Sequence, residues 1–450
     1  MKIYQNGLLQ EFYNETVSAQ WKNRDFVEYA RRYFLGANKK ILAIGGLRGT
    51  GKTTGLLQSA NLTDTLYITA QKGESEIGAD YIEIIKHTDK KTIIIDEYSW
   101  IKDRKELDYY LYTAVQNGKR IAITGTESIT LDFLNYGNLI HRVDMVHVNL
   151  FTYEEYCRLY QKKQSQAVCD EYLTTGGVFK EYILSNYDTT KNYVKTAIID
   201  NLVGYMDGTM SEEKATALVY AVLFKAVCPS NLKKIPVISQ NKLAIENFLA
   251  DFNVDSDTVF TEAELKRVAD ILEQVGVIVR VENYDQSNVN KCQYYIVNPS
   301  LTCQLILAAY KLPQITREIL GHVYEATVLC HLSYHLADGH RLYFLNTEIE
   351  PGVNKELDAV VLSENKDYAY FFECKHRADA VLSEKSTILS DDLQSVFPNS
   401  SIEARYVVFN GTPALRKYGE KEVLFSSLDE RVSQYYLYDY YREQLIKEHE

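Results

Sequence analysis

The sequence lacks any continuous apolar segment long enough to cross a lipid bilayer. No run approaches about eighteen uninterrupted apolar residues, and the first residues, Met-Lys-Ile-Tyr-Gln-Asn, lack the apolar stretch of a secretory signal. We therefore expect a cytoplasmic protein with no membrane partner. The hydrophobic content of 46% and the charged content of 24% are typical of globular chains. At 450 residues the chain is long enough for about three domains, each with its own core.

Cysteine pairs at the spacing of a disulfide framework or a zinc site are also absent. The seven cysteines are an odd number, are scattered singly and include no C-x-x-C pair. They are Cys157, Cys169, Cys228, Cys292, Cys303, Cys330 and Cys374. We expect buried, reduced thiols at these positions.

Basic residues are fewer than acidic ones, 49 against 61, which gives a net charge of −12. Non-specific affinity for nucleic acid grows with the number of phosphates that Lys and Arg neutralise, so this balance argues against a protein that coats nucleic acid. A local basic groove is still compatible with it. The 36 tyrosines follow no repeat, which favours packing over a base-stacking surface, and the chain has no internal repeat or low-complexity tract.

A phosphate-binding loop is the strongest motif that is present. Residues 46–53 read Gly-Leu-Arg-Gly-Thr-Gly-Lys-Thr, a complete G-x-x-x-x-G-K-T, after the apolar run Ile41–Ile44 and before a helix-like stretch. Backbone N–H groups of such a loop and the positive end of the helix surround a polyphosphate. Lys52 is expected to reach the β- and γ-phosphates, and the Thr53 hydroxyl to ligate Mg²⁺. The predicted ATP-binding residues are Gly46, Leu47, Arg48, Gly49, Thr50, Gly51, Lys52, Thr53 and Thr54.

A pair of carboxylates follows another apolar run. Thr92–Ile95 leads directly into Asp96-Glu97, the hhhhDE form of a Walker B element. A carboxylate at the end of such a strand lies at the sheet edge where a nucleotide binds. We expect Asp96 to hold the Mg²⁺ shell and Glu97 to polarise the water that attacks the γ-phosphate. A protein that only binds nucleotide has no need for a base there, so the pair predicts ATP hydrolysis.

Four apolar runs in the first part of the chain alternate with helical patterns. The runs are Ile41–Ile44, Leu66–Thr69, Thr92–Ile95 and Ile121–Thr124. This alternation predicts an α/β domain over residues 1–210, with a parallel sheet covered by helices on both faces. Residues 9–35 form a helical lead-in, and Ile101 to Val115 is the clearest connecting helix.

Two further domains are predicted after residue 210. Residues 211–310 carry helices followed by a hairpin, the pattern of a winged helix, and residues 311–450 form a separate α/β domain. The predicted helices of the second domain are Ala215–Val227, Lys242–Phe252 and Glu262–Val275, and its strands are Val277–Asn283 and Gln293–Val297. In the third domain we predict helices at Ile315–Ala337 and Leu389–Val396, and strands near Tyr343–Leu345, Leu357–Leu362, Tyr368–Lys375 and Ala404–Phe409. The acidic third helix of the winged helix favours a packing or relay role over DNA reading.

Carboxylates and a lysine recur on the predicted strands of the third domain. Strand alternation places Glu373 and Lys375 on one face, and a hairpin turn around residues 364–367 brings Asp358 opposite Glu373. Asp358 and Glu373 would hold Mg²⁺, Lys375 would orient a nucleophile, and Glu325 on the preceding helix would add another acid. Such a domain can also bind without cutting, and that alternative stays open.

The motif order resembles that of the prokaryotic AAA ATPases fused to a nuclease-like C-terminal domain. The resemblance rests on Gly-Thr-Gly-Lys-Thr-Thr, Ile-Ile-Ile-Asp-Glu and Ile-Thr-Gly-Thr, followed by residues 149–156 and 172–179. It implies an AAA-type P-loop fold, and the D…E-x-K set implies a restriction-endonuclease-like, or PD-(D/E)XK, domain. It also implies a water-placing hydroxyl at Thr126, with Thr124 and Ser128 as alternatives, and an arginine finger at Arg142. An arginine supplied by a neighbouring subunit would require a homo-oligomer.

The sequence supports two hypotheses on function. The first is an ATP-hydrolysing AAA-type protein that drives a winged-helix relay and a Mg²⁺-dependent nuclease-like domain, with DNA as a second substrate. The second is a nucleotide-gated regulatory switch whose C-terminal domain binds but does not cut. A transcription regulator that reads DNA through the wing is disfavoured by the acidic helix.

Overall fold

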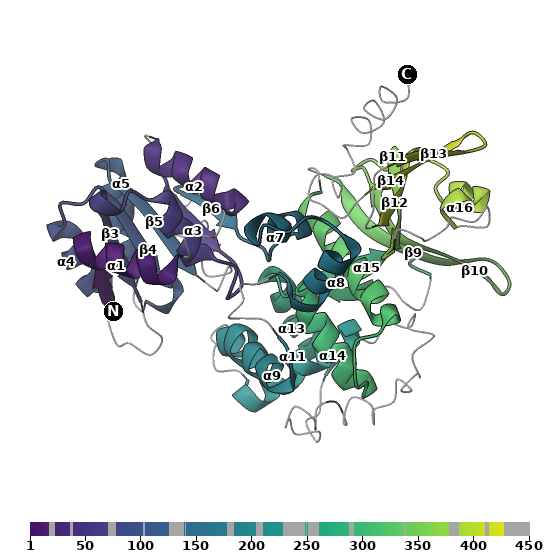
Figure 1. Cartoon of the computed structure of the whole chain (residues 1–450), viewed down its shortest axis with the longest axis horizontal. Helices are drawn as coiled ribbons and strands as arrows, with labels where there is room; N and C mark the ends of the chain where they lie inside the picture. Colours follow the sequence, from purple (N-terminus) through teal and green to yellow (C-terminus); the bar gives the residue numbers. More distant parts are fainter. Residues whose placement is uncertain are drawn as a thin grey trace.

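A sheet stands at each end of the molecule, with a group of helices between the two (Figure 1). The structure is a computed structural model. It describes residues 1–17, 23–36, 39–70, 78–101, 104–125, 139, 141–177, 184–203, 210–227, 248, 250, 261–287, 292–336, 339–377, 387–409 and 414–426.

The first sheet has six strands in the order β1-β3-β4-β5-β2-β6. Strands β2 to β6 are parallel, and β1 pairs antiparallel with β3 at the edge. The strands are β1 (Lys2–Tyr4), β2 (Ile41–Gly45), β3 (Thr65–Thr69), β4 (Thr92–Asp96), β5 (Arg120–Gly125) and β6 (Val143–His147). β5 lies between β2, which leads into the phosphate loop, and β4, which ends at Asp96.

Helices cover both faces of this sheet, because alternate residues of its strands enter two separate cores. Ile41, Ile93 and Ile95 pack with α4 and α5 on one face, and Leu42 and Ile94 pack with α1, α2 and α3 on the other. The helices are α1 (Asn6–Thr16), α2 (Asp25–Leu35), α3 (Lys52–Ser59), α4 (Gly78–His87) and α5 (Lys105–Gln116), with 3₁₀ turns η1 (Leu62–Asp64) and η2 (Tyr98–Trp100).

The middle of the chain is helical. It contains α7 (Tyr153–Leu159), α8 (Gln166–Thr175), α9 (Tyr187–Tyr193), the π-helical turn η4 (Val194–Ile199), α10 (Asp200–Val203), α11 (Glu212–Val227), α13 (Glu262–Gln274), α14 (Pro299–Tyr310) and α15 (Arg317–Tyr334). Several of these helices begin at side-chain caps. Thr152 and Glu155 form a capping box at α7, and Thr316 accepts a hydrogen bond from the Ile319 backbone at α15.

The second sheet has eight strands in the order β13-β14-β12-β11-β10-β9-β7-β8. They are β7 (Ile278–Asn283), β8 (Cys292–Ile296), β9 (Arg341–Glu350), β10 (Val353–Leu362), β11 (Tyr368–Lys375), β12 (Ser401–Phe409), β13 (Ala414–Tyr418) and β14 (Lys421–Ser426), with η5 (Thr387–Leu389) and α16 (Asp391–Val396) between β11 and β12. The β7–β8 hairpin joins the rest through a short parallel pairing of β7 with β9.

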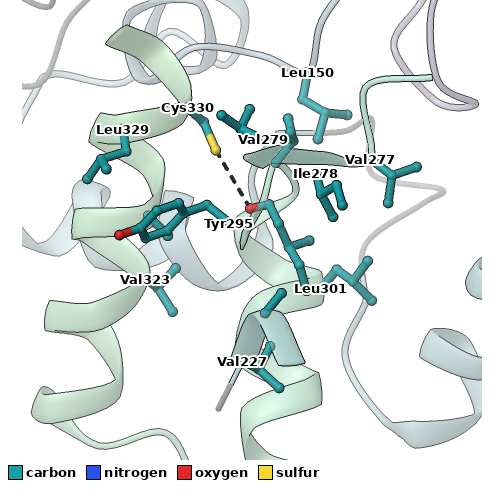
Figure 2. Close-up of a cluster of buried hydrophobic side chains, with 14 of the residues drawn as sticks. Leu150, Val227, Val277, Ile278, Val279, Tyr295, Leu301, Val323, Leu329 and Cys330 are labelled. Carbon is teal, nitrogen blue, oxygen red and sulfur yellow. Dashed lines mark hydrogen bonds between the residues drawn. The ribbon is translucent and has the colours of Figure 1, made fainter. Parts of the chain in front are cut away.

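One hydrophobic core links the middle helices to this second sheet. It contains Leu150 after β6, Val227 of α11, Ile278 of β7, Leu301 of α14 and Leu329 of α15. Figure 2 shows these side chains pointing toward one another from segments far apart in sequence. The helices between the two sheets are therefore packed as a continuous body against the β7–β8 hairpin and α15.

The structure confirms the α/β class and all four strands predicted in the first sheet. The helix predicted from Ile101 begins later, at Lys105, and the lead-in over residues 9–35 divides into α1 and α2. The hairpin predicted after residue 276 is present, but it belongs to the larger sheet. The helix predicted at Lys242–Phe252 lies in a region of which only residues 248 and 250 are described. The winged-helix, nuclease-like and domain-boundary assignments stay predictions.

The structure bears on membrane helices and on the cysteines. Among the described residues, no helix has the length and apolar character needed to cross a membrane. The cysteines are only partly as expected, because Cys292 and Cys374 are half-buried, whereas the other four described cysteines are buried. Cys228 lies outside the described residues.

Candidate functional site

The phosphate loop joins the end of β2 to the start of α3 in a conformation that requires glycine. Gly46 has φ of 152°, and a Cβ there would lie 2.3 Å from the Val148 carbonyl oxygen. Gly51 has φ of 82° and caps α3 in the left-handed region. The amino end of α3 therefore faces the loop, and its free N–H groups and helix dipole favour an anion there.

Lys52, the first residue of α3, is folded into this loop. Its ammonium donates to the carbonyl oxygens of Gly46 at 2.8 Å and Leu47 at 2.9 Å. Burial lowers the pKa of Lys52, and the nearby carboxylates Glu97 and Asp96 counter part of that effect. A positive charge is thus held beside the anion site by contacts that a phosphate oxygen can replace.

Asp96 is the centre of a network that joins three strands and the loop. Thr53 Oγ1 donates to Asp96 Oδ2 at 2.8 Å, and Tyr67 of β3 donates to the same oxygen. Thr124 of β5 donates to Asp96 Oδ1. The carboxylate is only 6% exposed and both of its oxygens accept hydrogen bonds, so its orientation is fixed.

Glu97 has a strained backbone next to this carboxylate. Its φ of 54° and ψ of 40° are left-handed, which is uncommon for a residue with a side chain. Its backbone N–H donates to Thr124 Oγ1 at 3.1 Å. Such strain persists only where surrounding contacts hold it, and it is concentrated at functional sites. Thr124 therefore sets the positions of both acidic residues.

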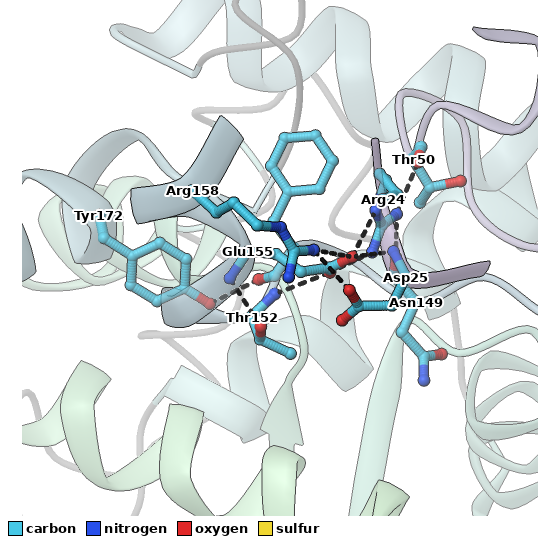
Figure 3. Close-up of polar contacts among 9 residues, drawn as sticks. Arg24, Asp25, Thr50, Asn149, Thr152, Glu155, Arg158 and Tyr172 are labelled. Carbon is cyan, nitrogen blue, oxygen red and sulfur yellow. Dashed lines mark hydrogen bonds and ion pairs between the residues drawn. The ribbon is translucent and has the colours of Figure 1, made fainter. Parts of the chain in front are cut away.

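A buried arginine braces the phosphate loop from outside. Arg24, just before α2, donates to the carbonyl oxygens of Thr50 at 2.6 Å and Asn149 at 2.8 Å. Its other nitrogens form a two-pronged ion pair with Glu155 of α7, at 3.1 Å to Oε1 and 2.6 Å to Oε2. Figure 3 shows Arg24 between these partners, with Arg158 paired to Asp25 beside it. The lead-in, the loop and α7 are thus joined at one guanidinium.

The resemblance assigned roles to Thr126 and Arg142, and the structure describes only the second of these residues. Thr126 and its alternative Ser128 lie outside the described residues, whereas Thr124 donates to the Asp96 carboxylate and accepts a hydrogen bond from the Glu97 backbone N–H. Arg142 lies at the start of β6, and its guanidinium is 3.9 Å from the centre of the Tyr112 ring. The loop is at the opposite end of the parallel strands, so Arg142 does not approach the phosphate site of its own chain. Its role as a finger toward a neighbouring subunit stays a prediction.

The second acidic cluster lies where β10 and β11 separate. The two strands pair antiparallel up to Ala359 and Phe372, with the turn at the predicted residues. One residue further on, the Asp358 side chain accepts a hydrogen bond from the Cys374 backbone N–H at 2.6 Å, in place of a ladder pair. Lys375 Nζ donates to Glu373 Oε1 at 2.5 Å. The predicted Asp358, Glu373 and Lys375 are therefore neighbours.

Electrostatic coupling brings Glu325 of α15 into the same cluster. Burial, and then repulsion from Glu373, raise the pKa of Glu325 to about 7. Burial and the carboxylates Glu373 and Glu325 raise the pKa of Asp358 well above its usual range. Burial would lower the pKa of Lys375, but Glu373 and Asp358 raise it overall. The cluster is an excess of carboxylates balanced by one ammonium, an arrangement that a cation would relieve.

Oxygen donors at both clusters suit a hard cation to different degrees. At the loop, the Thr53 hydroxyl and the Asp96 carboxylate are adjacent, which fits Mg²⁺ because this ion takes few protein oxygens and keeps several waters. In the part of the chain that the structure describes, no three His, Cys, Asp or Glu side chains are placed to share one metal ion. The second cluster therefore offers its carboxylates singly or in pairs, and not as a three-acid cage.

Replacing Glu325 by Gln should stabilise the metal-free protein at neutral pH. The raised carboxyl pKa means that the folded state holds its proton more tightly than the unfolded chain, so this group costs stability as the pH rises from about 5 to 8. We expect Glu325→Gln to raise the free energy of unfolding by about 1–2 kcal/mol at pH 8 and to have little effect at pH 4.5. Urea unfolding at the two pH values in EDTA measures this. An equal effect at both values would contradict the assigned pKa.

One segment, about a quarter of the chain, matches a known family. Residues 38–157 match a family model described as an AAA domain. This segment contains the phosphate loop, Asp96, Glu97 and the Thr124 bridge described above. The chain carries an AAA-type P-loop ATPase domain. The AAA domain accounts for the ATP-binding loop and supports ATPase activity in general.

The AAA domain and the rest of the chain are only distantly similar to solved structures. Hsp104 of S. cerevisiae, in a casein complex, has 13% identity and a TM-score of 0.27, over 60% of this chain and 52% of that one. A STAND protein of Pyrococcus horikoshii has 14% identity and a TM-score of 0.25, over 70% and 47%. The RuvB branch migration motor of Thermotoga maritima has 16% identity and a TM-score of 0.29, over 58% and 90%. The chain thus spans about half of the first of these, and no function is transferred from scores this low. No curated protein matches the sequence.

Sequence reasoning missed three residues of the AAA site. Tyr67 lies in a predicted strand, but its contact with Asp96 depends on which strand neighbours β4. Arg24 and Glu155 are 131 positions apart, and the only local signal is the capping pattern Thr-x-x-Glu at residues 152–155. Nothing in the sequence links that cap to an arginine in the lead-in.

Proposed function

We propose that this protein hydrolyses ATP with Mg²⁺ in its AAA domain and that the nucleotide cycle acts on a nuclease-like C-terminal module directed at DNA. The observation that supports the first part most strongly is the Asp96 network. It joins the loop hydroxyl of Thr53, the water-polarising candidate Glu97 and the bridging Thr124 at one sheet edge.

Each residue of the AAA site has a distinct task in this proposal. Lys52 exchanges its two carbonyl partners for the β- and γ-phosphate oxygens, and the amides at the start of α3 neutralise the same charge. Thr53 and Asp96 would hold Mg²⁺, which would supply positive charge to offset the negative charge that develops during hydrolysis. Glu97 accepts a proton from the attacking water, and its strained backbone fixes the direction from which it does so.

The second acidic cluster supports the nuclease-like part of the proposal. Two contacts support it, the hydrogen bond from the Cys374 backbone to Asp358 and that from Lys375 to Glu373, together with the electrostatic effect of Glu373 on Glu325. Asp358 and Glu373 would ligate Mg²⁺ at this cluster, and Lys375 would orient a nucleophile. The Lys375 side chain is 36% exposed and is therefore accessible from solvent, as a group that meets a large substrate must be.

ATP turnover and DNA cleavage by the same purified protein test this function. Wild type is compared with Lys52→Ala and Lys375→Ala, using Mg²⁺ or Mn²⁺ with labelled single- and double-stranded DNA. We expect Lys52→Ala to abolish ATP turnover, and Lys375→Ala to abolish cleavage with ATP turnover intact. Cleavage that survives Lys375→Ala would exclude the assigned cluster, and absence of ATP turnover in wild type would exclude the first part.

A nucleotide-gated switch with a non-cutting C-terminal module is the second candidate. Among the described residues, no three His, Cys, Asp or Glu side chains are placed to share one metal ion, which favours this candidate. The ion pair between Lys375 and Glu373 also favours it, because it engages the lysine that would orient a nucleophile. ATP turnover without cleavage under every metal would support it. In that case DNA binding that changes with nucleotide state would be the remaining activity of the module.

Tyr67→Phe should raise the Mg²⁺ requirement of the ATPase without disrupting the sheet. The substitution removes one donor from Asp96 and keeps the buried ring, which lies 5.2 Å from the Phe12 ring. We expect a loss of about 1–3 kcal/mol in the free energy of unfolding, typical of a hydrogen bond to a charged group, and a higher half-saturating Mg²⁺ concentration. Tyr109→Phe, at an exposed position, is the matched control. An unchanged Mg²⁺ titration would show that Tyr67 does not position Asp96.

A further inference from the structure

A buried histidine, His376, lies directly after β11, the strand that carries Glu373 and Lys375. It contacts α8, a helix about 200 residues earlier in the sequence. His376 Nε2 lies 2.8 Å from Asp170 Oδ1 and 3.1 Å from Gln166 Nε2, both on α8. The His376 side chain is only 7% exposed. It therefore ties the end of β11, where Glu373 and Lys375 lie, to a helix that follows the AAA domain in sequence.

The same imidazole also touches the helix that carries the third acid. Its ring centre is 5.8 Å from that of Tyr324, a fully buried residue of α15 that immediately precedes Glu325. His376 thus stands among α8, α15 and β11. A shift of α8 that moved His376 would displace the two elements that bear Glu325 and Lys375, because buried groups in close contact move together.

α8 is joined to the phosphate loop through α7 by direct contacts. Arg24 links the Thr50 carbonyl to Glu155 of α7. The Tyr172 ring of α8 lies 5.5 Å from that of Tyr153 and 5.4 Å from that of Tyr156, both on α7. Two hydrogen bonds complete this packing, from Tyr172 to the Phe151 carbonyl at 2.7 Å and from Tyr156 to Glu171 at 2.9 Å.

A cavity adjoins the Arg24–Glu155 pair. It has a volume of about 220 Å³, and its lining includes Arg24 and Glu155 together with His331 and Tyr334 of α15. The contacts described above run from the loop through the packed α7 and α8 to His376, and in Figure 1 these two helices lie between the sheets.

We propose that the Asp170–His376 contact couples the nucleotide state of the phosphate loop to the Glu373–Lys375 strand. Binding of ATP replaces the Lys52 contacts within the loop, and Arg24 transmits the resulting shift of Thr50 to α7 and α8. Asp170 is a positioning residue in this scheme, because it acts on the acidic cluster only through His376. The inference rests on the ATP-binding part of the proposed function.

Hydrogen exchange of the full-length protein, read by mass spectrometry, tests the coupling. Amide exchange is followed over residues 46–53 and 368–375 with no nucleotide, with ADP and with a slowly hydrolysed ATP analogue plus Mg²⁺. In wild type we expect the nucleotide to slow exchange at the loop and to change it at residues 368–375 by about fivefold or more. Asp170→Asn should abolish the change at residues 368–375 while protection of the loop and ATP turnover are retained.

Matched variants separate coupling from general damage. Asp188→Asn, an exposed acid in the first turn of α9, should behave as wild type, and Asp170→Glu should restore part of the response. If Asp170→Asn fails to fold, His376→Gln breaks the same contact from the other side. Loop protection in wild type without a change at residues 368–375, or a change that survives Asp170→Asn, overturns the coupling. Absence of protection at the loop overturns the proposed function itself.

Discussion

Glu97→Gln is expected to lower the turnover number for ATP by about 10²- to 10⁴-fold while ATP binding is retained. The substitution removes the proton acceptor but keeps the size and the backbone position of the side chain. The Glu97 N–H still donates to Thr124, so the Asp96 network should be preserved. Phosphate release gives the turnover number, and calorimetry with ATP and Mg²⁺ gives the affinity.

The control for this prediction is Glu106→Gln, an exposed acid in the first turn of α5. It should leave both measurements within a factor of about two, as is usual for surface substitutions. Turnover of Glu97→Gln close to that of wild type would show that another group accepts the proton. The Asp96 network would then serve binding alone.

Arg24→Ala should reduce the free energy of unfolding by about 3–5 kcal/mol, the loss expected when one partner of a buried ion pair is removed. The substitution leaves Glu155, whose side chain is 5% exposed, as a buried carboxylate that has lost its two-pronged ion pair and keeps only the longer contact with Arg158, at 3.8 Å. It also frees the Thr50 and Asn149 carbonyl groups that Arg24 satisfies. Urea unfolding followed by circular dichroism measures the loss.

An exposed ion pair on the next helix provides the control for Arg24. Arg32 pairs with Glu28 on α2 with 79% of its side chain exposed, so Arg32→Ala should cost at most about 0.5 kcal/mol. A paired replacement of Arg24 and Glu155 by apolar residues should recover most of the lost stability, because no buried charge remains. Equal losses for Arg24→Ala and Arg32→Ala would contradict the account of Arg24 as a buried brace.

The pH dependence of this brace follows from its charges. Burial alone would raise the pKa of Glu155, but the Arg24 guanidinium and backbone N–H groups lower it overall. A carboxyl with a depressed pKa contributes stability above its ordinary value near pH 4.5, and this contribution is lost as the pH falls through the folded-state value. The stability difference between wild type and Arg24→Ala should therefore shrink below pH 4.5.

Local sequence signals predicted the parts of the site that a strand end or a loop encodes. The phosphate loop, Asp96-Glu97 and the turn between β10 and β11 each lie in one short segment, so their geometry follows from glycine positions and strand ends. Asp358 shows the limit of such rules. The predicted position of Asp358 opposite Glu373 agrees with the register of the neighbouring Ala359–Phe372 pair, but no strand rule predicts that its carboxylate accepts a hydrogen bond from the Cys374 backbone.

Elements without a local pattern escaped prediction for physical reasons. Helix α14 is buried on nearly every side, so it lacks the apolar and polar faces that make a helix visible in sequence. β1 is only three residues long, and β13 is rich in polar residues. The union of the β7–β8 hairpin with the larger sheet depends on a two-residue pairing with β9 that no local signal encodes.

Calorimetric titration of the folded protein with ATP and Mg²⁺, beside Lys52→Ala, tests the central claim most directly. Lys52 is buried in the loop and donates to the carbonyl oxygens of Gly46 and Leu47. We expect saturable binding by wild type and a loss of affinity of at least about tenfold in the variant. Absence of binding by wild type at millimolar ATP, or equal affinity in the two proteins, would contradict it.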